Sequence, residues 1–141
     1  MIAIDTNVLL RYLLGDNEVQ AAKAEKLVCG KELVLITDVV LVETIWTLKG
    51  KKYQLKKSEL IAVSQALFQE PNIRFEDGQT VWLALNDYRK SKSKRGKDAD
   101  FSDALIVRKA KFAANGRTVD FGGVYTFDIA AQGLPGAKVP K

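Results

Sequence analysis

The sequence contains no histidine among its 141 residues and a single cysteine, Cys29. Without histidine, the chain cannot form a Ser-His-Asp or Cys-His catalytic constellation, and no acid–base scheme can use an imidazole. One cysteine also excludes an internal disulfide and a structural zinc site. An enzyme of this composition would work through carboxylates, lysines or hydroxyls, and its metal would be an oxygen-preferring ion such as Mg²⁺ or Mn²⁺.

Long apolar runs are missing as well. No stretch approaches the ~20 residues that a helix needs to span a bilayer. Residues 1–14 contain Asp5 and Arg11, so they lack the uninterrupted apolar segment of a signal peptide. We therefore expect a cytoplasmic protein without a membrane partner. The length and the 47% hydrophobic content favour one domain with a buried core over residues 1–141.

The net charge of +5 is unevenly distributed. Residues 49–57 hold five basic residues and residues 89–97 hold six, with no acid in either segment. Together these segments carry +11, which leaves −6 for the rest of the chain. An acidic body with two basic segments suits a polyanion bound around an acidic pocket, whereas the alternative is two solvated loops. The weak candidates for contacts with RNA phosphates are Lys51, Lys52, Lys92, Lys94, Arg95 and Lys97.

Short β-branched runs alternate with longer amphipathic segments. In the segment after Gly15, we expect Asp16 to cap the helix and Val19, Ala22, Leu27 and Val28 to face inward. The alternation predicts an α/β fold with a mainly parallel sheet covered on both faces. The predicted strands are 1–5, 33–37, 73–76 and 124–127, and the predicted helices are 7–14, 16–29, 38–48, 58–69, 78–89 and 101–114.

Two acids in the first half of the chain occupy unusual positions. Asp5 ends the first predicted strand, where functional groups of parallel sheets gather, and we expect it to be half-buried. Glu43 is the only charge inside VVLVETIW, so we expect this apolar helix to enclose it beside a cation. The alternatives are a helix cap for Asp5 and a Lys or Arg partner for Glu43.

The second half of the chain adds a group of acids in DADFSDALI. Asp100 and Asp103 are three residues apart, so they share one face at the start of the predicted helix, close to Asp98. Three acids in six residues exceed what capping needs, and their mutual repulsion favours a bound cation. Asp128 follows the last predicted strand, much as Asp5 ends the first. Capping remains the structural alternative for all of these acids.

The order of these motifs resembles a known family. IDTNVLLRYL at residues 4–13, the isolated Glu43, DFSDALIV at 100–107 and TFD at 126–128 are similar to the PIN-domain ribonucleases. The likeness is greatest to the VapC-type toxins of type II toxin–antitoxin pairs. It covers nearly the whole chain and implies a three-layer α/β/α sandwich whose sheet has about four to five short strands.

The resemblance also implies an activity and its residues. It implies hydrolysis of RNA phosphodiester bonds with Mg²⁺ or Mn²⁺, leaving a 5′-phosphate and a 3′-hydroxyl, in a homodimer inhibited by a small cognate antitoxin. Carried over by position, the core acids are Asp5, Glu43 and Asp103. Asp100 and Asp128 match further acids, and all five are expected to hold the metal directly or through water. The supporting polar residues are Thr6, Asn7 and Thr126.

Other functions fit these residues less well. A HAD-type phosphatase needs a second aspartate two residues after the first, where this chain has Asn7. A response-regulator receiver has paired acids after an early strand, and MIAID offers only Asp5. A non-catalytic RNA- or protein-binding domain with a vestigial pocket remains open; loss of a core acid would favour it, and none is missing.

Overall fold

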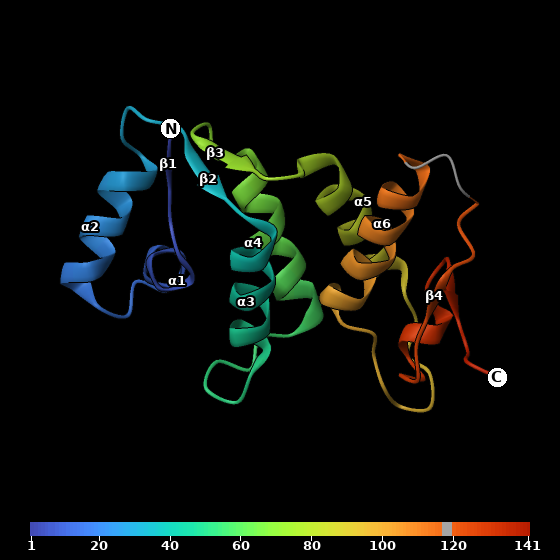
Figure 1. Ribbon diagram of the computed structural model, residues 1–141. Coiled ribbons are helices and arrows are strands. Elements are labelled where there is room, and N and C mark those ends of the chain that lie inside the picture. Colours follow the sequence, from blue (N-terminus) through green and yellow to red (C-terminus); the bar gives the residue numbers. More distant parts are fainter. Residues whose placement is uncertain (117–119) are drawn as a thin grey trace. The chain divides into compact units, whose positions relative to one another are not determined.

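The computed structural model describes residues 1–116 and 120–141, and the chain divides into two compact units, Met1–Gly78 and Gln79–Lys141 (Figure 1). The prediction of one domain over the whole chain stays a prediction. No helix in the described ranges is long and apolar enough to cross a membrane. The elements in these ranges are β1 (Ile2–Ala3), α1 (Thr6–Leu14), α2 (Glu18–Val28), β2 (Val34–Ile36), α3 (Asp38–Lys49), α4 (Lys57–Gln69), β3 (Ile73–Phe75), α5 (Gly78–Lys90), α6 (Phe101–Asn115), β4 (Val124–Tyr125), a 3₁₀ turn (Ala131–Gly133) and β5 (Ala137–Lys138).

The first unit is built on a parallel sheet of order β1-β2-β3. The central strand β2 carries the apolar run VLI, and its Val34 and Ile36 are fully buried. Val34 lies opposite Ile2 on one side and Ile73 on the other. A short strand buried between two neighbours favours β-branched residues, which pack well on the pleated surface. The predicted α/β class with parallel strands is confirmed.

Four helices surround this sheet, and local signals fix their ends. The side chain of Asp5 caps α1, and Gly15, at a φ of +63° that only glycine adopts without strain, ends it. The Thr37 hydroxyl caps α3. Helix α1 packs against α2 and α3, while α4 packs against α3 and β3. The larger side chains that this packing buries are Leu9, Val28, Leu41, Leu48, Leu60 and Leu67.

The second unit contains α5, α6 and the two-stranded sheet β4-β5. These two strands also pair in parallel, with Tyr125 opposite Lys138. All five strands of the described residues are therefore parallel, but they are divided between a three-stranded and a two-stranded sheet. The larger apolar side chains buried in this unit are Val81, Leu85, Tyr88, Phe101, Leu105 and Leu134.

The predictions for α2 are wrong in two respects. Asn17, rather than Asp16, caps the helix by accepting a hydrogen bond from the backbone N–H of Gln20 at 3.0 Å. Val19 is 66% exposed, and Ala22 and Leu27 are also exposed. Only Ala24 and Val28 are buried on this helix, because it lies at the edge of the unit and needs a narrow apolar stripe.

An ion pair joins the two helices of the second unit. The Arg108 guanidinium on α6 donates to both carboxylate oxygens of Asp87 on α5, at 2.5 and 2.9 Å. The Asp87 side chain is 11% exposed and that of Arg108 is 26% exposed. Hydrogen bonding to Asp87 raises the pKa of Arg108 above its ordinary value. Because this pair is largely shielded from water, it contributes more than an ordinary surface ion pair.

Replacing Arg108 by methionine should lower the free energy of unfolding by about 1–3 kcal/mol, because the Asp87 carboxylate loses its partner in a shielded position. The double variant Asp87→Asn with Arg108→Met should lose less than the sum of the two single losses. Urea unfolding followed by circular dichroism measures the free energy of unfolding of the unaltered chain, the two single variants and the double variant. Arg89→Met, at an exposed position on α5, serves as the control, with an expected change within about 0.5 kcal/mol. Strict additivity of the two single losses would contradict the coupling.

Candidate active site

Asp5 lies where β1 leads into α1. Its Oδ1 accepts a hydrogen bond from the backbone N–H of Val8 at 2.9 Å, so the predicted structural role as a helix cap is confirmed. The carboxylate is exposed rather than half-buried as predicted. The reason is that a capping side chain covers the open end of a helix, where the first N–H groups face solvent.

Glu43 of α3 is held by the residue that follows Asp5. The Thr6 hydroxyl donates to Glu43 Oε2 at 2.5 Å, which joins the start of α1 to the middle of α3. Glu43 takes part in this contact itself, and Asp5 is the sequence neighbour of Thr6, so two of the predicted core acids lie in the same part of the first unit. The role of Thr6 in supporting a catalytic acid stays a prediction.

Glu43 is exposed, so the prediction of an enclosed side chain is wrong. Helix α3 buries Leu41, Ile45 and Leu48, while Trp46 on its outer side remains 72% exposed. An apolar composition predicts that a helix is buried, but it cannot say which face is buried when both faces carry large apolar residues. Glu43 therefore needs no buried cation to compensate its charge.

In the second unit, Asp100 and Asp103 share the N-terminus of α6. Asp103 Oδ2 accepts a hydrogen bond from the backbone N–H of Asp100 at 3.0 Å, as in a capping box. Burial raises the pKa of nearby Tyr88 to about 12, and the negative charges of Asp100 and Asp98 add to this shift. The Tyr88 phenol therefore stays protonated at neutral pH.

Asp128 is positioned by a turn directly after β4. The Thr126 hydroxyl accepts a hydrogen bond from the Asp128 backbone N–H at 3.0 Å, and Asp128 Oδ1 accepts one from the N–H of Ala131 at 2.9 Å. Asp128 thus accepts a hydrogen bond from the first residue of the short 3₁₀ turn, although Ala130, and not Asp128, occupies the N-cap position of that turn. The Thr126 hydroxyl thus holds the backbone of Asp128, and its predicted role in supporting a catalytic acid stays a prediction.

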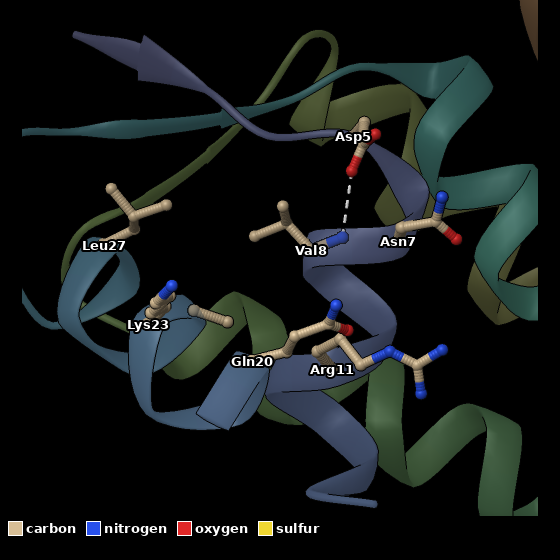
Figure 2. Close-up of a pocket in the computed structure, with 8 residues that line it drawn as sticks. Asp5, Asn7, Val8, Arg11, Gln20, Lys23 and Leu27 are labelled. Carbon is tan, nitrogen blue, oxygen red and sulfur yellow. Dashed lines mark hydrogen bonds between the residues drawn. The ribbon is translucent and has the colours of Figure 1, made fainter. Parts of the chain in front are cut away.

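A pocket of about 270 Å³ opens beside Asp5, between α1 and α2 (Figure 2). Asn7 and Arg11 of α1 line it together with Gln20 and Lys23 of α2. Arg11 and Lys23 line this pocket together with Asp5, which was not predicted from the sequence. The signal was weak, because the helical spacing of two separate helices does not reveal which of their residues face each other.

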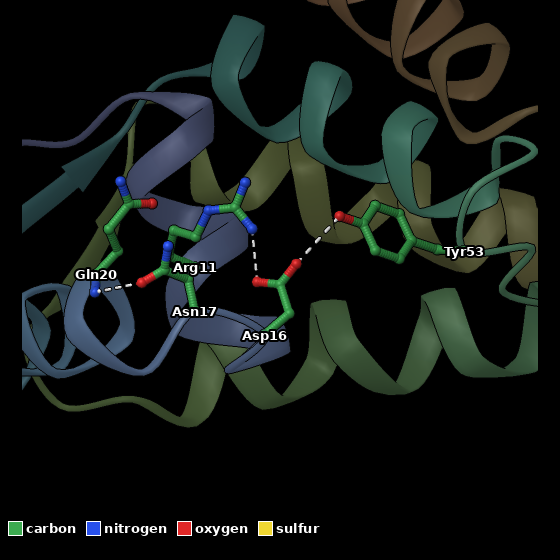
Figure 3. A network of polar contacts seen from close by, with 5 residues as sticks. All are labelled: Arg11, Asp16, Asn17, Gln20 and Tyr53. Atoms are coloured by element: carbon green, nitrogen blue, oxygen red, sulfur yellow. Dashed lines mark hydrogen bonds and ion pairs between the residues drawn. The ribbon is translucent and has the colours of Figure 1, made fainter.

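Arg11 belongs to a polar network at the Gly15 turn (Figure 3). Its guanidinium donates to Asp16 Oδ1 at 2.5 Å, and the Tyr53 hydroxyl lies 3.5 Å from Asp16 Oδ2. The hydrogen bond from Arg11, with its positive charge, lowers the pKa of Asp16 below the ordinary value. Asp16 thus holds the guanidinium that lines the pocket, which explains why it does not cap α2.

The five predicted acids fall into two sets, one in each unit. The first unit carries Asp5 and Glu43, linked through Thr6, and the second carries Asp100, Asp103 and Asp128. Within residues 1–116 and 120–141, no group of three or more acidic or cysteine side chains is arranged to hold a metal ion. The donor set nevertheless fits Mg²⁺ or Mn²⁺, since carboxylate oxygens are the ligands that these hard cations prefer.

One family of known proteins matches most of the chain. The family described as "PIN domain" matches residues 2–117 of the chain. The matched range contains Asp5, Glu43, Asp100 and Asp103, whereas Asp128 lies beyond it. No curated protein matches the chain.

Replacing Arg11 by methionine should raise the pKa of Asp16 toward its ordinary value of 3.8. Because the folded-state pKa of Asp16 is lowered, its contribution to stability is present above the unfolded-state pKa and is lost as the pH falls through the folded value. Carbon-13 NMR titration of the Asp16 carboxyl group measures both proteins. An unchanged Asp16 titration in the variant would show that Arg11 does not stabilise the carboxylate.

Proposed function

The chain belongs to the PIN-domain family of nucleases, and on that premise we propose that it is a Mg²⁺- or Mn²⁺-dependent endoribonuclease. The observation that carries the proposal is the family match over residues 2–117, which spans four of the five predicted acids. The fifth, Asp128, is supported by its turn with Thr126. The carboxylates proposed to hold the metal, directly or through water, are Asp5, Glu43, Asp100, Asp103 and Asp128.

The chain's own residues would prepare the ligands. Each cap hydrogen bond uses one oxygen of a carboxylate, as Oδ1 of Asp5 does, so a cap and a metal ligand can be the same side chain. The positive ends of α1 and α6 stabilise the ionised acids at their starts. Thr6 orients Glu43, which either binds the metal or orients the attacking water. When bound, the metal supplies water activation and neutralises charge that grows on the phosphate during hydrolysis.

Replacing Asp5 or Asp103 by asparagine should reduce Mg²⁺-dependent RNA cleavage by at least about 100-fold, since either change removes a negative ligand. Asparagine is a good helix cap, so the fold should persist. Cleavage of a labelled single-stranded RNA, with EDTA as the metal-free comparison, measures the effect. Normal cleavage by both variants would exclude these acids from the active site.

The matched control is Glu59→Gln. Glu59 is also an acid in the first turn of a helix, and its Oε1 accepts a hydrogen bond from the Lys56 backbone N–H at 3.0 Å. It lies outside the proposed set, so the same loss of charge should leave cleavage unchanged within about twofold. An equal loss of activity in this control would point to destabilised helices rather than to missing metal ligands.

We further propose that the nuclease is the toxin of a toxin–antitoxin pair, acts in the cytoplasm as a homodimer, and stops translation or growth when its small antitoxin is absent. The support is the resemblance of the DTN, DFSDA and TFD motifs to the VapC-type toxins. The proposal predicts a small gene next to the one that encodes this chain, whose product blocks the active site.

Expression of the chain alone should arrest growth, and co-expression of the neighbouring gene should relieve the arrest. Mapping of RNA ends in the arrested cells should reveal new 5′-phosphate ends at defined sites. The Asp5→Asn variant, expressed to the same level, is the control and should not arrest growth. Arrest by this inactive variant, or an unaffected culture with the intact chain, would contradict the toxin role.

A further inference from the structure

The second unit carries a basic groove in which Lys94 of the 89–97 segment lies beside basic residues from the C-terminal end of the chain. A cavity of about 590 Å³ lies along β5 and is lined by three lysines, Lys94, Lys138 and Lys141, together with Tyr125 and Gln132. Among the residues that the structure describes, no acidic side chain lines it. Resting on the proposed nuclease function, we propose that this groove binds single-stranded RNA, with a base stacked on Tyr125 and the phosphates held by the lysines.

The parallel pairing of β4 and β5 places the aromatic ring and a lysine together. Tyr125 and Lys138 are register partners, so their side chains stand on the same face of the two-stranded sheet. The Tyr125 side chain is 62% exposed, which leaves a ring face available to a base. Single-stranded nucleic acid is commonly bound in this manner, by aromatic stacking platforms inside positively charged grooves.

Lys138 is held in place by a close approach of the backbone. Gly123 has a φ of +109°, and a side-chain carbon added there would lie 3.0 Å from Cδ and Cε of Lys138. The aliphatic stem of the lysine therefore packs over the glycine. This packing reduces the freedom of the stem while leaving the ammonium group to contact a ligand.

Lys94 reaches the groove from a tight hairpin. Lys94 and Lys97 exchange two backbone hydrogen bonds, at 2.8 and 3.1 Å, around a turn in which Arg95 and Gly96 both have positive φ. A second cavity of about 420 Å³ shares Lys94 and adds Lys90 and Lys92. The one acid among the described residues that line it is Asp87, which is paired with Arg108. The two cavities thus form a basic track that continues on both sides of Lys94.

The groove lies at the edge of the small sheet that also carries Asp128. Because β4 and β5 are parallel, their carboxyl ends meet at the same edge. Thr126 to Asp128 follow β4 at that edge, and Val139 to Lys141 follow β5. Asp128, one of the acids proposed for catalysis, thus follows β4 at the same end of the small sheet, although it does not line the groove. The lysines would attract either RNA or an acidic peptide. The exposed ring of Tyr125 favours RNA, because a base can stack on it.

Fluorescence anisotropy of a labelled, unstructured 12-nucleotide RNA in EDTA tests the inference, because binding is then measured without cleavage. Lys138→Ala with Lys141→Ala should weaken binding at least about tenfold and reduce the salt slope by about 1.4, as expected for two lost phosphate contacts on a single strand. Tyr125→Ala should weaken binding roughly 5- to 100-fold with little change in the salt slope. Tyr125→Phe should bind within about twofold of the unaltered chain.

The matched control removes two exposed lysines of the first unit, Lys26 and Lys31, and should change affinity less than about twofold. Three results would overturn the inference: no RNA binding by the unaltered chain, an equal loss in the control, or unchanged affinity in Tyr125→Ala. Displacement by polyglutamate as effective as by RNA would also overturn it, in favour of an acidic protein partner. RNA cleavage is measured in a separate assay with Mg²⁺. If the unaltered chain cleaves RNA but the groove variants bind RNA normally, the proposed groove is refuted and the proposed nuclease function is not.

Discussion

Parallel strand pairing is the constraint on which the arrangement of polar groups in this chain depends. In a parallel sheet, every strand ends at the same edge, and the residue that follows a strand begins the next helix or turn. Asp5 and Asp128 each come two or three residues after a two-residue strand of a parallel sheet. Asp5 caps α1, and Asp128 accepts a hydrogen bond from the first residue of the 3₁₀ turn. Because these strands are short, few residues separate the buried core from the polar edge of the sheet, so an acid that follows a strand lies close to the core.

The capping roles of the acids do not compete with a catalytic role. A carboxylate has two oxygens, and a cap hydrogen bond occupies one of them. Such a bond also limits rotation of the side chain. Part of the conformational entropy that the side chain would lose on binding a cation is therefore already lost when the protein folds. Thr6 acts on Glu43 in the same way from a neighbouring helix. Structural and functional explanations of these acids are therefore complementary, although the sequence presents them as alternatives.

Much of the fold was predictable from the sequence because periodicity and caps are local signals. The predicted bounds of α3, α5 and α6 lie within one residue of those observed. Strand β5 was missed because Ala137–Lys138 has neither β-branched residues nor alternation, and its pairing with β4 is long-range. The exposure of Glu43 was also unpredictable, since an apolar helix such as α3 does not reveal which face its neighbours cover.

The two basic segments also show that sequence patterns do not reveal which residues the fold brings together. Residues 49–57 are largely explained by local structure: Lys49 ends α3, Lys52 lies 5.2 Å from the ring centre of Tyr53, and Lys56 precedes α4. This favours the solvated-loop interpretation for that segment. The 89–97 segment differs because folding brings Lys94 to a cavity shared with Lys138 and Lys141, about 45 residues further along the chain. Basic residues separated this widely form no run in the sequence, so composition alone underestimates the surface that a polyanion would meet.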